Sequence, residues 1–128
     1  MDSRTEEILK RFKESWDQTE ARFDGLIESD DWFRRLMPIR AFISKIKGEG
    51  YANHFRLGTS MHALLLSRSV NFGLRIEQKR IKIESVDVND FEVALSDGDK
   101  IYRQYRLRDL NDERISKLLK TLKSTLVD

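Results

Sequence analysis

With 128 residues, the chain fits a single domain with one hydrophobic core. It has no cysteine, which excludes disulfides and thiolate catalysis, and its 24 basic and 22 acidic residues give a net charge of +2, too small to require a polyanionic partner. The charged N-terminus lacks the apolar stretch of a signal peptide, and the longest aliphatic run, residues 63–66, is too short to span a bilayer. We therefore expect a cytoplasmic protein without a membrane partner.

Residues 4–28 have the periodicity of a long amphipathic helix. Ser3 and Glu6 form a capping box at its start, and Gly25 is the point where it would bend or end. Thr19 fills one gap in a stripe of large apolar side chains that recur at spacings of three and four residues: Ile8, Leu9, Phe12, Trp16, Phe23, Leu26 and Ile27.

A second helix is predicted over residues 31–47, with Ser29 or Asp30 as its cap. Pro38 lies inside its pattern and removes a backbone donor, so we expect a kink there or a restart with Pro38 at the first helical position. The glycines of residues 48–50 end the helix. We expect the aromatic side chains of both helices to pack on a sheet: Phe12, Trp16, Phe23, Trp32, Phe33 and Phe42.

From residue 54 to residue 107 the pattern changes to that of strands, which predicts an antiparallel sheet of four or five strands. Residues 63–66 are apolar on both faces, as in a strand that is covered twice, or covered once and used in an oligomer. Residues 71–73 have the composition of a turn.

The apolar parity flips at Gln78-Lys79, and two structures explain the flip equally well. A two-residue loop would pair Ile76 with Ile81 and Leu74 with Ile83 on one face. A β-bulge within one continuous strand, which we favour because Gln-Lys is a poor hairpin turn, would have the same effect on parity.

A further hairpin is predicted around Gly98, within the turn sequence of residues 96–99. We expect Gly98 to have a positive φ and Leu95 to face Ile101 on the core side. The other core-facing side chains expected on its two arms are Phe91, Val93, Tyr105 and Leu107.

A C-terminal helix is predicted over residues 111–126, with Asn111 or Asp109 as its cap. Its apolar stripe consists of Ile115, Leu118, Leu119, Leu122 and Leu126. The predicted fold is therefore α+β over residues 1–128, with N-terminal helices, a central antiparallel sheet and a C-terminal helix packed on that sheet.

No motif predicts catalysis. His54 and His62 would share a face of a regular strand, but no spacing supplies further metal ligands. Residues 58–60, Gly-Thr-Ser, lack the additional glycines and the lysine of a phosphate loop. Glu77 and Lys79 form the Glu-x-Lys fragment of some magnesium nucleases, but no acidic residue lies between Glu49 and Glu77 to complete the site. We expect no enzyme, no metal and no cofactor.

Two surfaces are candidates for binding. Leu64 and Leu66 would form the interface of a homodimer if the second helical segment left them exposed. A basic sheet face with an aromatic side chain would suit single-stranded nucleic acid: Arg75, Arg80, Lys82, Tyr102 and Arg106, with Arg103 and Arg108 nearby. The balanced charge favours an ordinary solvated face, so we expect a non-catalytic interaction or regulatory module that binds a protein partner or itself, with nucleic-acid binding as the alternative.

Overall fold

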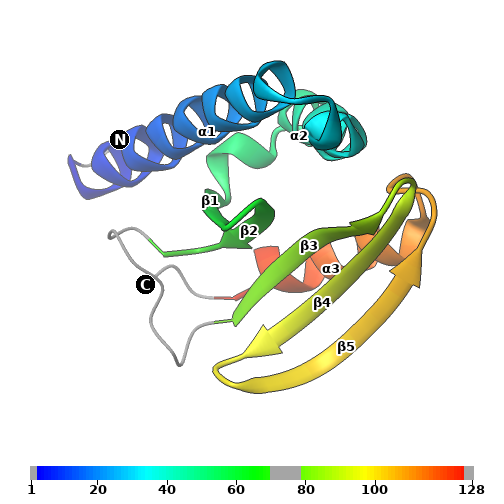
Figure 1. The fold of residues 1–128 in the computed structure, drawn as a ribbon. Coiled ribbons are helices and arrows are strands. Elements are labelled where there is room, and N and C mark those ends of the chain that lie inside the picture. Colours follow the sequence, from blue (N-terminus) through cyan, green and yellow to red (C-terminus); the bar gives the residue numbers. More distant parts are fainter. Residues whose placement is uncertain (1–2, 70–78, 126–128) are drawn as a thin grey trace.

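The computed structural model describes residues 3–69 and 79–125 and has the predicted α+β arrangement (Figure 1). Its helical segments are α1 Ser3–Ser29, the 3-10 helix η1 Asp31–Leu36, α2 Met37–Gly48, the 3-10 helix η2 Tyr51–Asn53, and α3 Glu113–Lys123. Its strands are β1 Arg56–Ser60, β2 Ala63–Ser67, β3 Lys79–Asp87, β4 Asp90–Asp97 and β5 Lys100–Leu107. No helix in this described part of the chain has the length and apolarity needed to cross a membrane.

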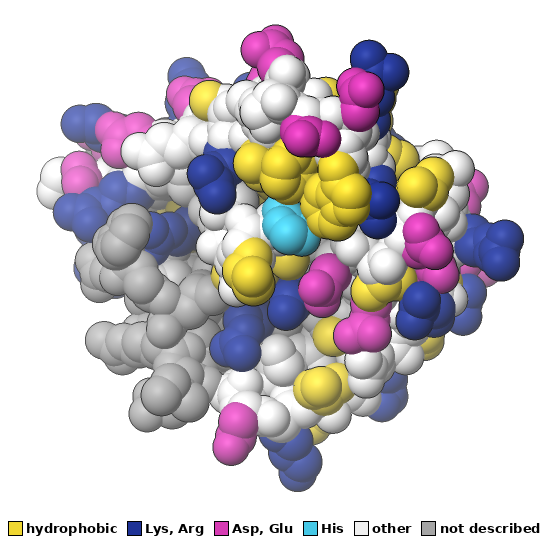
Figure 2. Space-filling model, in the orientation of Figure 1, with side chains coloured by type: hydrophobic (Ala, Val, Ile, Leu, Met, Phe, Trp, Pro, Cys, Tyr) yellow, Lys and Arg dark blue, Asp and Glu magenta, His cyan; other side chains and the backbone are white. Residues whose placement is uncertain are grey.

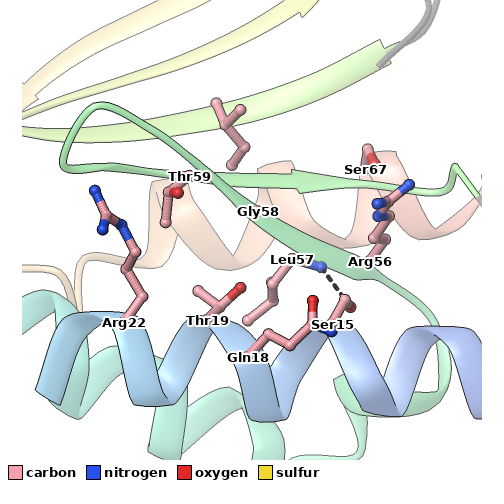
Figure 3. Close-up of a pocket in the computed structure, with 10 residues that line it drawn as sticks. Ser15, Gln18, Thr19, Arg22, Arg56, Leu57, Gly58, Thr59 and Ser67 are labelled. Carbon is pink, nitrogen blue, oxygen red and sulfur yellow. Dashed lines mark hydrogen bonds between the residues drawn. The ribbon is translucent and has the colours of Figure 1, made fainter. Parts of the chain in front are cut away.

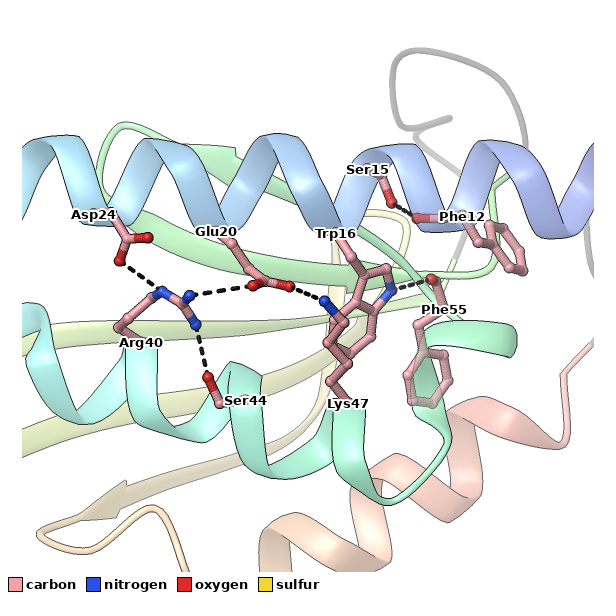
Figure 4. Close-up of polar contacts among 9 residues, drawn as sticks. All are labelled: Phe12, Ser15, Trp16, Glu20, Asp24, Arg40, Ser44, Lys47 and Phe55. Carbon is pink, nitrogen blue, oxygen red and sulfur yellow. Dashed lines mark hydrogen bonds and ion pairs between the residues drawn. The ribbon is translucent and has the colours of Figure 1, made fainter.

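The first predicted helix is confirmed, and α1 continues through Gly25 to Ser29. Three aromatic side chains of its stripe, Phe12, Trp16 and Phe23, are fully buried. The indole N–H of Trp16 donates a hydrogen bond of 2.7 Å to the carbonyl oxygen of Phe55, which fixes the start of β1 against the helix (Figure 4). This bond crosses from an early helix to the first strand, so it positions the two elements that form the cleft described below.

The second predicted helix is in fact two segments, a 3-10 helix followed by an α-helix. The Asp30 carboxylate accepts a 2.8 Å hydrogen bond from the backbone N–H of Trp32 and caps η1. Helix α2 then begins at Met37 with Pro38 in its first turn, where the missing N–H of proline has no intrahelical partner to lose. The expected restart at Pro38 is confirmed.

Ion pairs hold α1 against α2 (Figure 4). The Arg40 guanidinium lies 2.8 Å from the carboxylate of Asp24 and 3.1 Å from that of Glu20. Lys47 pairs with the second oxygen of Glu20 at 2.9 Å. Because Glu20 and Arg40 are mostly buried, these contacts define the distance between the two helices better than exposed pairs would.

Among the described residues, the strands form one antiparallel sheet in the order β1-β2-β3-β4-β5. One face, called the core face here, packs against α3, which lies behind β3–β5 in Figure 1. Its buried side chains are Leu57, Leu64, Leu66, Ile81, Ile83, Phe91, Val93, Leu95 and Leu107. The opposite, open face has no described helix in front of β3–β5. Apart from Leu65, it bears mainly polar and small side chains, including Arg56, Gly58, Ser67, Arg80, Lys82, Glu84, Glu92, Gln104 and Arg106.

The expectation that Leu64 and Leu66 form a dimer face is wrong, because both side chains are fully buried within one chain. They belong to the same core cluster as Ile39, Phe42 and Ile43, so the second helical segment contributes to their cover. Self-association itself stays a prediction.

The neighbours expected for Ile81 and Ile83 in a two-residue hairpin are also wrong. On one side these residues pair with Leu66 and Leu64 of β2, and on the other with Leu95 and Val93 of β4. Both edges of β3 are therefore occupied. Residues 71–73, Leu74, Ile76 and Gln78, which carry the predicted turn and the alternative bulge, lie outside the described residues.

The hairpin at Gly98 forms, and the glycine has a φ of 65° as expected. Its register differs from the prediction, because Ser96 and not Leu95 pairs with Ile101. The two-residue turn fixes Asp97 opposite Lys100, and a bulge before Arg103 then returns β5 to the parity that turns Leu107 to the core. Ile101 is consequently 55% exposed.

The C-terminal helix is confirmed, but its cap is neither Asn111 nor Asp109. Asp112 is the N-cap, since its carboxylate accepts a 2.9 Å hydrogen bond from the backbone N–H of Arg114. Asp109 instead accepts a 2.9 Å bond from the N–H of Asn111 and closes the turn that precedes the helix.

Candidate functional site

The structure brings three of the five predicted nucleic-acid residues to the open face. Arg80 and Lys82 lie on the same face of β3, with the core residue Ile81 between them. Arg106 lies on that face two strands away, on β5. Tyr102 lies at the bulge and is 48% exposed. Arg75 lies outside the described residues.

Acidic side chains offset much of the positive charge on this face. Two hydrogen bonds of 2.7 and 2.9 Å join Arg106 to Asp90, and they hold the pKa of the Asp90 carboxyl below its ordinary value. Lys82 lies 3.7 Å from Glu84, and Glu92 stands between Glu84 and Arg106 in the register. The interleaved charges are those of a solvated sheet face, and nucleic-acid binding stays a prediction.

The two histidines do not share a strand. His54 follows η2, whereas His62 lies in the turn between β1 and β2. The residues that the structure describes contain no group of three His, Cys, Asp or Glu side chains placed to hold a metal ion. Of the nuclease-like fragment, Lys79 begins β3 and Glu77 lies outside the described residues.

An aromatic cluster, defined here as Trp32, Phe33 and His62, lies on the surface where η1 meets the β1–β2 turn. The ring of Trp32 makes edge-to-face contacts with Phe33 at 5.1 Å and with His62 at 5.2 Å between ring centroids. The Arg35 guanidinium lies 4.1 Å from the centroid of the same ring. Figure 2 shows a histidine bordered by hydrophobic side chains near the middle of this face. The expectation that Trp32 packs on the sheet is wrong, because 45% of it is exposed.

The β1–β2 turn also contains Met61, which directly precedes His62 of the cluster. Met61 is 82% exposed and has a φ of 57°, a left-handed conformation that non-glycine residues adopt at a cost. Strain of this kind is concentrated at functional sites in many proteins. The turn therefore presents an apolar side chain to solvent and bears a conformational cost to do so.

A cleft of about 410 Å³ lies between α1 and the β1–β2 hairpin (Figure 3). Helix α1 contributes Ser15, Gln18, Thr19 and Arg22, and the two strands contribute Arg56, Leu57, Gly58, Thr59, Leu65 and Ser67. Arg22 and Arg56 lie at opposite ends of the cleft in Figure 3, with the hydroxyl-bearing side chain of Thr19 and the backbone of Gly58 between them. None of the described lining residues is acidic.

Ser15 has a structural role at one end of the cleft. Its hydroxyl donates to the carbonyl oxygen of Phe12 and accepts a 3.0 Å hydrogen bond from the backbone N–H of Leu57, on the strand edge that faces the helix. By contrast, the side chains of Gln18, Thr19 and Thr59 have no hydrogen-bond partner within the described part of the chain. Their polar groups line the cleft and are available to a ligand.

The cations of the cleft differ in environment. Arg22 is exposed and has no ion pair with any described residue. Arg56 is half-buried, and this burial, with a smaller effect from the nearby charge of Arg11, lowers the pKa of its guanidinium. A partly desolvated guanidinium attracts an anion more strongly than one in bulk water.

Sequence reasoning missed both surfaces. A threonine within the apolar stripe of α1 and a glycine inside a strand were the available signals, because glycine within a strand often marks the close approach of a ligand. A carbon atom added at Gly58 in the position of a Cβ would have no heavy atom within 4 Å, so packing does not require this glycine.

Comparison of the chain with protein-family models, with curated proteins and with solved structures found no match.

Proposed function

We propose that the chain is a non-catalytic protein-interaction module and that a partner protein docks on the aromatic cluster. The observation that carries this proposal is the fixed, exposed ring of Trp32, which is held by Phe33, His62 and Arg35. A side chain that is already ordered loses little conformational entropy when a partner covers it. Tryptophan in particular supplies much of the binding energy in protein interfaces.

The surroundings of the cluster support the proposal. Met61 adds a flexible apolar side chain, which adapts well to a partner surface. Asp31 and Arg34, whose side chains lie 3.4 Å apart and are largely exposed, form part of a polar margin on η1. An apolar centre with a polar rim is the usual composition of a protein interface.

The partner is either a different protein or a second copy of the chain, and two measurements separate these cases. Sedimentation at micromolar concentration gives a mass of 15.1 kDa for a monomer and twice that mass for a homodimer. In the second measurement, the immobilised chain is incubated with lysate of its host, with and without nuclease treatment of the lysate. Capture of a different protein in both samples identifies a heterologous partner.

The two substitutions Trp32→Ala and Met61→Ser should each abolish capture or dimerisation while circular dichroism shows an unchanged fold. Val88→Ser, which removes an apolar side chain that is 61% exposed in the β3–β4 turn, is the matched control and should have no effect. Capture that nuclease removes, and that Trp32→Ala leaves intact, would contradict the proposal. It would instead support nucleic-acid binding through Arg80 and Lys82.

A further inference from the structure

We propose that the cleft between α1 and the β1–β2 hairpin binds a small molecule that carries phosphate or carboxylate groups. Arg22 and Arg56 would each bind an anionic group, and Thr19, Thr59 and Gln18 would bind the polar atoms between these groups. This binding site is separate from the aromatic cluster and does not depend on the proposed docking of a protein.

The size and shape of the cleft suit a small metabolite. Its volume of about 410 Å³ lies within the range of pockets that hold small molecules, roughly 300–1,000 Å³. Ser15 of α1 lies beside Leu57 of β1 at one end of the cleft, and Arg22 lies about two helical turns further along α1, at the other end (Figure 3). The cleft is therefore elongated along the helix. An elongated ligand with charge at both ends fits this arrangement better than a compact single ion.

The charge of the cleft selects an anion. Both of its ionisable lining residues in the described chain are arginines, and guanidinium groups bind phosphate and carboxylate through paired hydrogen bonds. Arg22 forms no ion pair with a described residue, so a ligand would not have to displace a carboxylate from it. The two guanidinium charges therefore favour an anionic ligand over a cationic one.

The polar groups between the arginines indicate a ligand with hydroxyl or further oxygen atoms. The Thr19 hydroxyl lines the cleft and has no hydrogen-bond partner among the described residues. Thr59 and Gln18 add a second hydroxyl and an amide. Leu57 and Leu65 add apolar contacts for the carbon skeleton of such a ligand.

Isothermal titration of the whole chain with three probes tests the proposal. Fructose 1,6-bisphosphate carries a phosphate at each end, citrate carries carboxylates, and inorganic phosphate is a single ion. We expect saturable binding of at least one of the two larger probes, with a Kd about tenfold or more below that of inorganic phosphate, because only the larger probes reach both arginines. The tighter of the two larger probes identifies the anionic group as phosphate or as carboxylate.

Four variants locate the binding. Arg22→Gln removes a cation, Thr19→Val replaces a hydroxyl at constant volume, and Gly58→Val fills the cleft from the strand without a change of charge. Each should weaken binding of the preferred probe by about fivefold or more. Lys13→Gln, which removes an exposed charge from α1 outside the cleft, is the matched control and should leave the Kd unchanged. Thermal unfolding verifies that each variant is folded.

Three results would overturn the proposal. The first is no saturation by any probe up to about 10 mM, which is weaker than a specific site of this kind should bind. The second is an equal loss in Lys13→Gln and Arg22→Gln, which would show attraction to the general charge of α1. The third is full binding by both Thr19→Val and Gly58→Val, because a ligand in the cleft must contact at least one of these positions.

Discussion

Met61 and Asn89 are the two non-glycine residues of the described chain with positive φ, at 57° and 51°. Both lie in tight turns between strands, but they differ in how well they tolerate this conformation. Asparagine enters the left-handed region readily, because its short polar side chain can bond locally, whereas methionine has no such compensation. The β1–β2 turn should therefore be less stable with methionine at position 61 than with glycine at the same position.

Met61→Gly should raise the free energy of unfolding by about 0.5–1 kcal/mol, since the relief of the left-handed strain exceeds the entropy that glycine adds to the unfolded chain. Asn89→Gly is the matched comparison and should have a smaller effect. Urea unfolding followed by circular dichroism measures both. A loss of stability in Met61→Gly would mean that the methionine side chain contributes packing that outweighs its strain. If the proposed function is right, the stabilised variant should also lose its partner.

Trp16 and Trp32 allow a second comparison between single residues. Trp16 is fully buried and donates to the carbonyl oxygen of Phe55, whereas the largely exposed Trp32 donates no hydrogen bond from its indole N–H to a described residue. Trp16→Phe leaves a buried carbonyl oxygen without its donor and should cost about 1–3 kcal/mol. Trp32→Phe should cost about 0.5 kcal/mol or less. Equal losses in urea unfolding would show that the bond to Phe55 does not stabilise the fold.

Helix α3 depends on one carboxylate at its start. Hydrogen bonds from the Arg114 side chain and then from the Arg114 backbone lower the pKa of Asp112 from 3.8 to about 2. A carboxyl group with a lowered pKa in the folded state stabilises the fold above its unfolded-state pKa, and this contribution disappears as pH falls through its folded-state pKa. The contribution of Asp112 should therefore be complete at neutral pH and should be lost between pH 3.8 and about 2.

Thermal unfolding of Asp112→Ala measures this dependence. The variant should have a lower Tm than the native chain at neutral pH, and the difference should shrink as pH falls and vanish near the folded-state pKa of about 2. Asp17→Ala removes an exposed carboxylate from α1 and controls for the general loss of negative charge. A Tm difference that is constant over this pH range would contradict the assignment of Asp112 as a charged cap.

The elements that sequence predicted well are those whose residues carry a local signal. Helical spacing located α1 and α3 within a few residues. For the second segment, predicted as one helix, Pro38 marked the restart at which α2 begins. The β1–β2 turn was not predicted, because Met61 and His62 are not turn-forming residues. The bulge in β5 was missed for a different reason. The register of β5 must satisfy both the two-residue turn at Gly98 and the burial of Leu107 in the core, and the local sequence does not show how these two demands combine.

The two surfaces depend on the assembled molecule. Thr19 and Gly58 lie almost forty residues apart in the sequence, and only the packing of α1 beside the edge of β1 brings them to one cleft. Similarly, Trp32 follows the apolar period of its segment, and the 3-10 winding of η1 contributes to turning it outward. The side chains of Leu64 and Leu66 could not be assigned to the core or to an interface from an apolar run alone, because that choice depends on where α2 packs.

The sheet has its helical cover on the core face, so adjacent residues of β2 should respond very differently to the same substitution. Leu64 is fully buried on the core face, whereas Leu65 is half-buried on the open face and lines the cleft beside Arg22 and Arg56. Leu64→Asp places a carboxylate in the core and should cost more than about 4 kcal/mol, enough to unfold most small domains.

Leu65→Asp should cost about 1 kcal/mol or less, because the new carboxylate can reach solvent and lies near two guanidinium groups. Circular dichroism and urea unfolding of the two variants measure the contrast. A folded Leu64→Asp chain with half the native mass would restore the interpretation of Leu64 as an interface residue. A Leu65→Asp chain as unstable as Leu64→Asp would mean that the open face of β2 is covered as tightly as the core face, and the cleft could then not admit a ligand.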